Sequence, residues 1–98
     1  MSESRWPFDQ PQNCAAISCR AVLFSGAPVL LVVHYSEDHS WAFLDGEDFR
    51  AEDGAVVSME RAVGTDSTLL EVADLPPGWV ATREGIGGAW QRKPDPDV

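Results

Sequence analysis

The sequence has few basic residues: 7 lysines and arginines stand against 16 aspartates and glutamates, which gives a formal net charge of −9. A surface of this sign repels nucleic-acid phosphates and anionic lipid headgroups. It favours solubility and attracts a basic partner. We therefore expect no nucleic acid and no membrane among the partners of this chain.

The sequence also lacks a long hydrophobic run and a secretory signal. The longest uncharged apolar stretch covers residues 27–33, far short of the roughly 20 residues that cross a bilayer. The N-terminal residues contain no basic region followed by an apolar stretch, so we expect no signal peptide. These absences predict a cytoplasmic protein.

The chain contains 2 cysteines, Cys14 and Cys19. In an extended segment this spacing places them on opposite faces and about 16 Å apart, at about 3.3 Å per residue. A disulfide needs Cα atoms within about 7 Å of each other. We therefore expect both thiols to be reduced, in a reducing compartment.

The length and composition predict a single hydrophobic core. The chain has 98 residues, of which 44% are hydrophobic, and a domain of this size folds without disulfides or a structural metal. We expect an irregular leader over residues 1–12, one domain over 13–92 and a mobile, proline-containing tail over 93–98.

Apolar runs and turn residues predict the elements of that domain. Strands are expected over residues 14–24, 29–35 and 41–44, with the second of these in the centre of the sheet. Ser58 and Asp66 are expected to cap helices over residues 59–63 and 67–75. A hairpin is expected over residues 79–83 and 89–92. The predicted fold is α+β, a mostly antiparallel sheet of about five strands with two short helices packed on one side.

Metal-ligand residue types gather once in the sequence, at His34, Glu37, Asp38 and His39. The spacing is not that of a helical zinc motif, and a hydrolytic zinc site needs three positioned ligands. We therefore predict no metal and no cofactor. Binding of a metal or a small molecule by His34 and His39 is retained as an alternative interpretation.

A catalytic site is not indicated by any motif. Neither cysteine lies in an electropositive or helix-start context that would lower the pKa of its thiol. No serine has the setting of an activated nucleophile. We predict that the protein is not an enzyme.

The 4 tryptophans predict a core rich in aromatic side chains. Trp79 and Trp90 fall in the expected hairpin and are predicted to pair across it. A second interpretation gives one or two tryptophans to an exposed binding face. In that interpretation these tryptophans anchor the partner, and Arg83 and Arg92, in neighbouring strands, give the face polar definition.

Acidic residues concentrate between residues 37 and 53, which contain seven acids and one arginine. We predict that this segment docks a protein partner with a basic surface, since charge complementarity raises the association rate. The predicted partner-binding residues are Glu37, Asp38, Asp45, Glu47, Asp48, Trp41 and Arg83.

The order of several short motifs resembles that of a known group of proteins. Pro28-Val29 opens a strand, residues 40–44 (SWAFL) lead into an acidic Asp45-Gly46 loop, and residues 75–78 (LPPG) precede a strand that ends at Arg83. In this order, residues 14–92 resemble small bacterial domains of unknown function that are grouped with the immunity proteins of toxin systems. The chain departs from their pattern because no basic residue shortly precedes the Trp41 strand, and the Trp90 segment has no counterpart. The resemblance implies an α+β fold and inhibition of a toxin by direct binding, with no catalytic residues.

The principal interpretation is therefore a small acidic protein-interaction module that resembles immunity proteins. The alternatives are the metal or small-molecule site at His34 and His39 and a structural accessory domain. In the last case an edge strand could form a homodimer.

Overall fold

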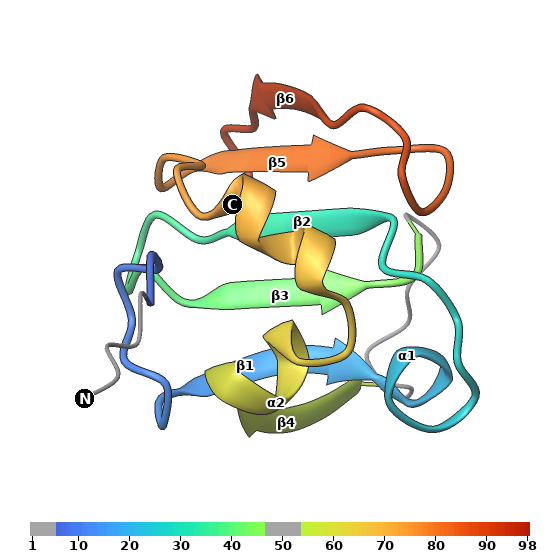
Figure 1. Ribbon diagram of the computed structural model, residues 1–98. Coiled ribbons are helices and arrows are strands. Elements are labelled where there is room, and N and C mark those ends of the chain that lie inside the picture. Colours follow the sequence, from blue (N-terminus) through green and yellow to red (C-terminus); the bar gives the residue numbers. More distant parts are fainter. Residues whose placement is uncertain (1–5, 47–53) are drawn as a thin grey trace.

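Short strands and helices follow one another closely along the chain, and the turns between them bring the strands into one sheet (Figure 1). The computed structural model describes residues 6–46 and 54–98. The strands are β1 (Ala15–Cys19), β2 (Leu31–His34), β3 (Trp41–Leu44), β4 (Gly54–Ser58), β5 (Trp79–Thr82) and β6 (Gln91–Pro94). The helices are α1 (Arg20–Phe24), α2 (Met59–Val63) and the 3-10 helix η2 (Ser67–Val72).

The sheet has six strands in the order β4-β1-β3-β2-β5-β6. β1 pairs in parallel with β3, and the other neighbouring pairs are antiparallel. The predicted α+β class is confirmed. The details differ, because the part of the chain that the structure describes forms a mixed sheet of six strands, where about five were predicted, and three short helices instead of two.

The centre of the sheet is formed by β2 and β3, the two most apolar strands. All four residues of β3 are buried, and the register pairs Val32 with Phe43 and His34 with Trp41. A strand that is apolar on both faces needs cover on both sides. The apolar runs in the sequence therefore predicted these two strands correctly.

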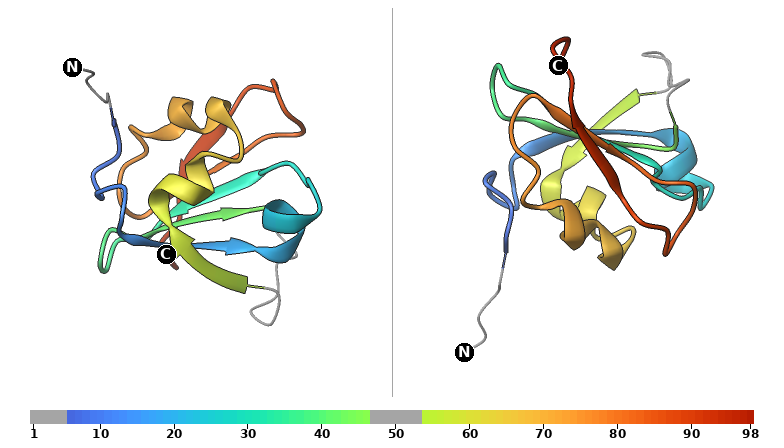
Figure 2. Two further views of the ribbon diagram at one scale, coloured as in Figure 1. Left: turned by 60° about the horizontal axis from the view of Figure 1, so that its bottom comes forward. Right: turned by 90° about the horizontal axis from the view of Figure 1, so that it is seen from above.

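Helices α2 and η2 lie over one face of the sheet (Figure 2). The predicted caps are confirmed: Ser58 Oγ accepts a hydrogen bond from the Arg61 N–H, and Asp66 Oδ1 accepts one from the Thr68 N–H. The buried side chains that these helices contribute are Met59, Ala62, Val63, Leu69 and Val72. The second helix is shorter than predicted and is a 3-10 helix that ends at Val72.

Residues 14–24 do not form the single long strand that was predicted. Strand β1 ends at Cys19, and α1 begins at Arg20. Within α1, Val22 is buried, whereas Phe24 is 71% exposed. The β-branched and apolar residues of this segment suit a strand locally, but the face available to residues 20–24 buries only part of them.

The two ends of the described chain lie against the domain. Residues 6–13 contain no helix or strand, yet Phe8 is buried and its ring lies 4.9 Å from that of Trp41. At the other end, Lys93 and Pro94 belong to β6, although they were predicted to be part of a mobile tail. Proline is compatible with an edge strand because its missing N–H is not needed there.

A membrane-spanning helix would have to be far longer and more apolar than those seen in residues 6–46 and 54–98, where none qualifies.

Candidate functional site

The turn between β2 and β3 and the segment before β1 lie at the same end of the sheet (left-hand side of Figure 1). His34 is the last residue of β2 and Trp41 the first of β3, so both lie at this end. The turn between these strands contributes His39, and the segment before β1 contributes Asp9. We refer to Asp9, His34 and His39 as the Asp9–His cluster.

The carboxylate of Asp9 is the centre of this cluster. Its Oδ1 accepts a hydrogen bond of 2.8 Å from Trp41 Nε1. Its Oδ2 lies 3.1 Å from Nε2 of His34 and 3.6 Å from Nδ1 of His39. The two histidine rings therefore converge on one oxygen atom.

His34 is held in a fixed orientation. The residue is 2% exposed, its ring stacks on Trp41 at 3.9 Å, and its Nδ1 lies 2.6 Å from the carbonyl oxygen of Leu75. A carbonyl only accepts hydrogen bonds, so Nδ1 carries the proton of a neutral ring and Nε2 presents a lone pair. That lone pair faces Oδ2 of Asp9 at a distance of 3.1 Å. A nitrogen lone pair and a carboxylate oxygen this close repel each other unless a proton or a cation lies between them.

His39 has an unusual backbone conformation. Its φ of 61° lies in the left-handed region, which non-glycine residues seldom adopt, although His and Asn do so more often than most. Its side chain is 54% exposed. The cluster is therefore buried on the His34 side and open to solvent on the His39 side.

Sequence reasoning found the two histidines but paired them with the wrong acids. Glu37 and Asp38 were grouped with them because they are neighbours in the chain, whereas the structure supplies Asp9, 25 residues before His34. One signal could have found Asp9. Trp6 and Phe8 flank Pro7, and aromatic side chains in such a leader usually fold back onto the core, which brings the residue after Phe8 to the sheet.

Four further carboxylates lie at the same end of the molecule. Hydrogen bonds bring the tail to the β2–β3 turn: Ser36 Oγ donates to Val98 O at 2.8 Å, and the Asp95 N–H donates to Gly78 O at 2.8 Å. Gly78 in turn donates its N–H to His34 O at 2.7 Å. We call these four carboxylates the acidic end. They belong to Glu37, Asp38, Asp95 and Asp97.

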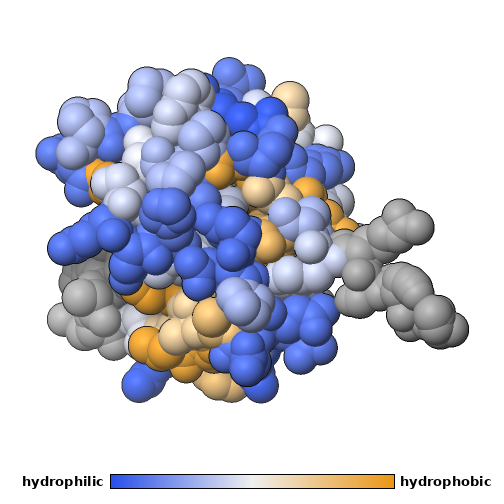
Figure 3. All heavy atoms as spheres, turned by 90° about the vertical axis from the view of Figure 1, so that its left-hand side faces the viewer, coloured by the Kyte–Doolittle hydropathy of each residue, from blue (hydrophilic) through white to orange (hydrophobic). Residues whose placement is uncertain are grey.

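The surface at this end is predominantly hydrophilic, with smaller apolar areas (Figure 3). Glu37, Asp38 and Asp97 are exposed and Asp95 is half-exposed. Hydrogen bonds from the side chain and then the backbone N–H of Ser40 lower the pKa of Asp38 below its usual value of 3.8. Asp38 therefore keeps its negative charge at neutral pH.

The predicted acidic segment does not form one surface in the described residues. Asp45 follows β3, whereas Glu37 and Asp38 precede it, so they lie at opposite ends of that strand. The Asp45 carboxylate also lies 3.5 Å from the thiol of Cys19, which donates to it. Glu47 and Asp48 lie outside the described residues.

Two predicted partner-binding residues are buried in the structure. Trp41 is 0% exposed and packs between Phe8, His34 and Phe43. Arg83 is 6% exposed. Neither side chain can serve as the surface anchor that was predicted, because each is covered by the domain's own core.

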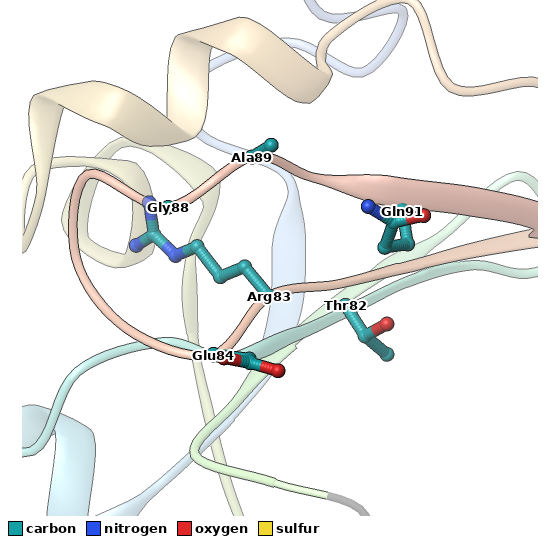
Figure 4. A pocket seen from close by; sticks show the side chains of 6 residues that line it. All are labelled: Thr82, Arg83, Glu84, Gly88, Ala89 and Gln91. Atoms are coloured by element: carbon teal, nitrogen blue, oxygen red, sulfur yellow. The ribbon is translucent and has the colours of Figure 1, made fainter.

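Arg83 is held in place by internal partners. Its guanidinium donates to Val29 O, Thr68 Oγ1 and Asp66 Oδ2 at 2.8–3.0 Å, and it lies 4.2 Å from the ring centroid of Trp90. Figure 4 shows the guanidinium beside Gly88, next to an open pocket of about 590 Å³. Trp90 stacks on Arg83 and not on Trp79, which is paired with Pro94, so the predicted Trp79–Trp90 pair is wrong.

The expectation that neither cysteine lies at a helix start is wrong for Cys19, which is the N-cap residue of α1. Cys14 is half-buried and Cys19 is buried, and both are free thiols. Cys19 lies at the end of β1, and its thiol donates a hydrogen bond to the carboxylate of Asp45.

Comparisons of the chain with protein families, with curated proteins and with solved structures found no match. The Asp9–His cluster and the acidic end are therefore interpreted from their geometry.

Proposed function

We propose that this domain is a protein-interaction module that binds a basic partner through its acidic end. The observation that supports this proposal is the attachment of the tail to the β2–β3 turn by the Ser36–Val98 hydrogen bond. It brings carboxylates from two distant segments of the chain to one end of the molecule. The proposal keeps the predicted residues Glu37 and Asp38 and replaces Trp41 and Arg83 by Asp95 and Asp97.

The charges of the acidic end are available to a partner. In residues 6–46 and 54–98, no arginine or lysine forms an ion pair with any of its four carboxylates. Exposed charges of one sign steer an oppositely charged protein and raise its association rate, an effect that salt weakens. Such a surface controls encounter more than residence time.

The partner that we propose is a protein with a basic surface, in the cytoplasm. The resemblance to immunity proteins favours a toxin that this domain inhibits by covering a basic site. Inhibition of this kind requires contact and no catalytic residue in the domain.

The test begins with affinity capture from the native host and continues with the purified partner. A triple variant, Glu37→Gln with Asp38→Asn and Asp97→Asn, removes three exposed charges from the acidic end. We expect its affinity to fall about tenfold, since exposed ion pairs contribute about 0.2–1 kcal/mol each. The salt dependence of the association rate should fall with it.

A matched control removes the same charge elsewhere. Glu60, Glu71 and Glu84 are exposed and lie outside the acidic end, so their replacement by glutamine should leave the affinity within about twofold. Equal weakening by both triple variants would show that total charge matters and that the acidic end does not.

A further inference from the structure

The Asp9–His cluster places a ring nitrogen against a carboxylate oxygen, an arrangement that a proton or a cation between the two atoms stabilises. Nε2 of His34 and Oδ2 of Asp9 face each other at 3.1 Å, while the other ring nitrogen of His34 is committed to Leu75 O. Nδ1 of His39 approaches the same Asp9 oxygen at 3.6 Å. From this geometry we infer that Asp9, His34 and His39 bind a divalent transition-metal ion of the zinc class. This site is separate from the carboxylates of the acidic end.

The distances between the ligand atoms fit a metal of this kind. Zinc binds nitrogen and oxygen ligands at about 2.0–2.1 Å in a tetrahedron, whose neighbouring ligand atoms are then about 3.3 Å apart. The observed separations of 3.1 and 3.6 Å lie on either side of that value, and the three ligand atoms all lie within 4.8 Å of one another. A small movement of the exposed His39 ring is enough to complete the site.

The surroundings of the cluster orient its ligands. His34 donates its Nδ1 proton to Leu75 O, which leaves Nε2 free to coordinate. Trp41 Nε1 donates to Oδ1 of Asp9, which leaves Oδ2 directed at both histidines. Hydrogen bonds of this type, from the far side of each ligand, are typical of metal sites in proteins.

The ligand types select the class of ion. Two imidazoles and one carboxylate suit zinc, cobalt and similar ions, whereas calcium requires six to eight oxygen ligands and magnesium retains most of its water. The exposure of His39 leaves a path for entry and a fourth position for water. The nearby acidic end raises the local concentration of cations.

The experiment uses the full chain, freed of metal by a chelator. Titration calorimetry with ZnCl₂ should show one ion bound per chain, and CoCl₂ should give visible absorption bands with the intensity of a four-coordinate nitrogen and oxygen site. Replacing His39 by asparagine removes one ligand but tolerates the left-handed backbone. We expect this His39→Asn variant to bind zinc at least about tenfold more weakly and to lose the cobalt bands.

The control is the double variant Glu37→Gln with Asp38→Asn, which removes charge beside the cluster and leaves its ligands in place. It should keep the cobalt bands and lose less than about threefold in zinc affinity. The inference is overturned if zinc does not bind, if His39→Asn binds zinc as the unmodified chain does, or if only the control variant loses binding. The last result would indicate general attraction of cations to the acidic end.

Discussion

At the scale of single residues, Arg83 combines a positive charge with a fully buried side chain. It forms an ion pair of 2.8 Å with Asp66, whose side chain is 13% exposed. Replacing Arg83 by methionine leaves the Asp66 carboxylate buried without its partner. We expect the free energy of unfolding to fall by about 3 kcal/mol or more, measured by urea denaturation.

The exposed pair of Arg92 and Asp74 provides the control for this prediction. Their side chains are 38% and 79% exposed, so Arg92→Met should change the free energy of unfolding by less than about 1 kcal/mol. In addition, the double variant Arg83→Met with Asp66→Asn should lose less stability than the two single variants combined. Equal effects of Arg83→Met and Arg92→Met would contradict the structural role of Arg83.

Asp66 also predicts how stability depends on pH. Burial alone raises the pKa of Asp66, but hydrogen bonds from the side chain and backbone of Thr68, together with Arg83, outweigh it and hold the pKa below 3.8. The folded state therefore binds this proton more weakly than the unfolded state. The stabilisation is complete above the usual pKa of an aspartate and is lost as the pH falls through the lower, folded value.

We therefore expect Asp66→Asn to flatten the fall of unfolding free energy between about pH 5 and about pH 2. Urea denaturation of both proteins across this range measures the difference. Asp74→Asn is the control, because its exposed carboxylate contributes little to stability. An unchanged slope in the Asp66→Asn variant would mean that this carboxylate is not stabilised in the folded state.

How well single residues could be predicted from the sequence depended on the distance to their partners. The caps Ser58 and Asp66 were predicted correctly because each accepts a hydrogen bond from a residue two or three positions away. The roles of His34 and Arg83 were not predicted correctly, because their hydrogen-bond partners are up to 54 residues away in the sequence. A charged or polar residue in an apolar segment indicates a buried partner but does not identify it.

At the scale of elements, the predictions succeeded where one element determines its own environment. The apolar runs of β2 and β3 are buried almost throughout, and α2 has both its cap and its apolar face within one short stretch. For these elements, local preference and final burial agree. This agreement explains why the central strands of the sheet were predicted close to their observed bounds.

The missed elements are those whose structure depends on neighbours distant in the chain. β4 contains small and β-branched residues after an acidic stretch, and it forms a strand because all five of its residues pair with β1. β4 lacks the alternating pattern that would have identified it. β6 was predicted, as the hairpin strand over residues 89–92, but it lies at Gln91–Pro94, where charged residues and a proline are held by pairing with β5.

At the scale of the whole molecule, the sequence predicted the excess of negative charge but not where the acidic residues lie on the surface. The sequence concentrates acids between residues 37 and 53, but β3 separates Asp38 from Asp45 by its full length. The tail then adds Asp95 and Asp97 to the end that holds Glu37 and Asp38. Proximity in sequence is a poor guide to a surface when a strand lies between two charged turns.

The tail also closes part of the sheet face opposite α2 and η2. Val98 is half-buried and packs against the core, its carbonyl accepts the hydrogen bond from Ser36, and it borders a groove of about 300 Å³ whose other lining residues include Leu31, Val33 and Val80. Removing residues 96–98 eliminates this packing and the hydrogen bond. The loss is partly offset because fewer residues lose conformational entropy on folding. We expect a net loss of about 1 kcal/mol in the free energy of unfolding.

Asp97→Asn is the matched variant for this truncation, because it removes the charge of the tail and keeps Val98 in place. It should unfold at the same urea concentration as the unmodified chain or at a slightly higher one, since it reduces repulsion from Glu37 and Asp38. The truncated chain should unfold at a lower concentration and bind more of a dye that recognises apolar surface. If truncation left both measurements unchanged, the tail would be mobile, as the sequence alone had indicated, and Asp95 and Asp97 would have no fixed place in the acidic end.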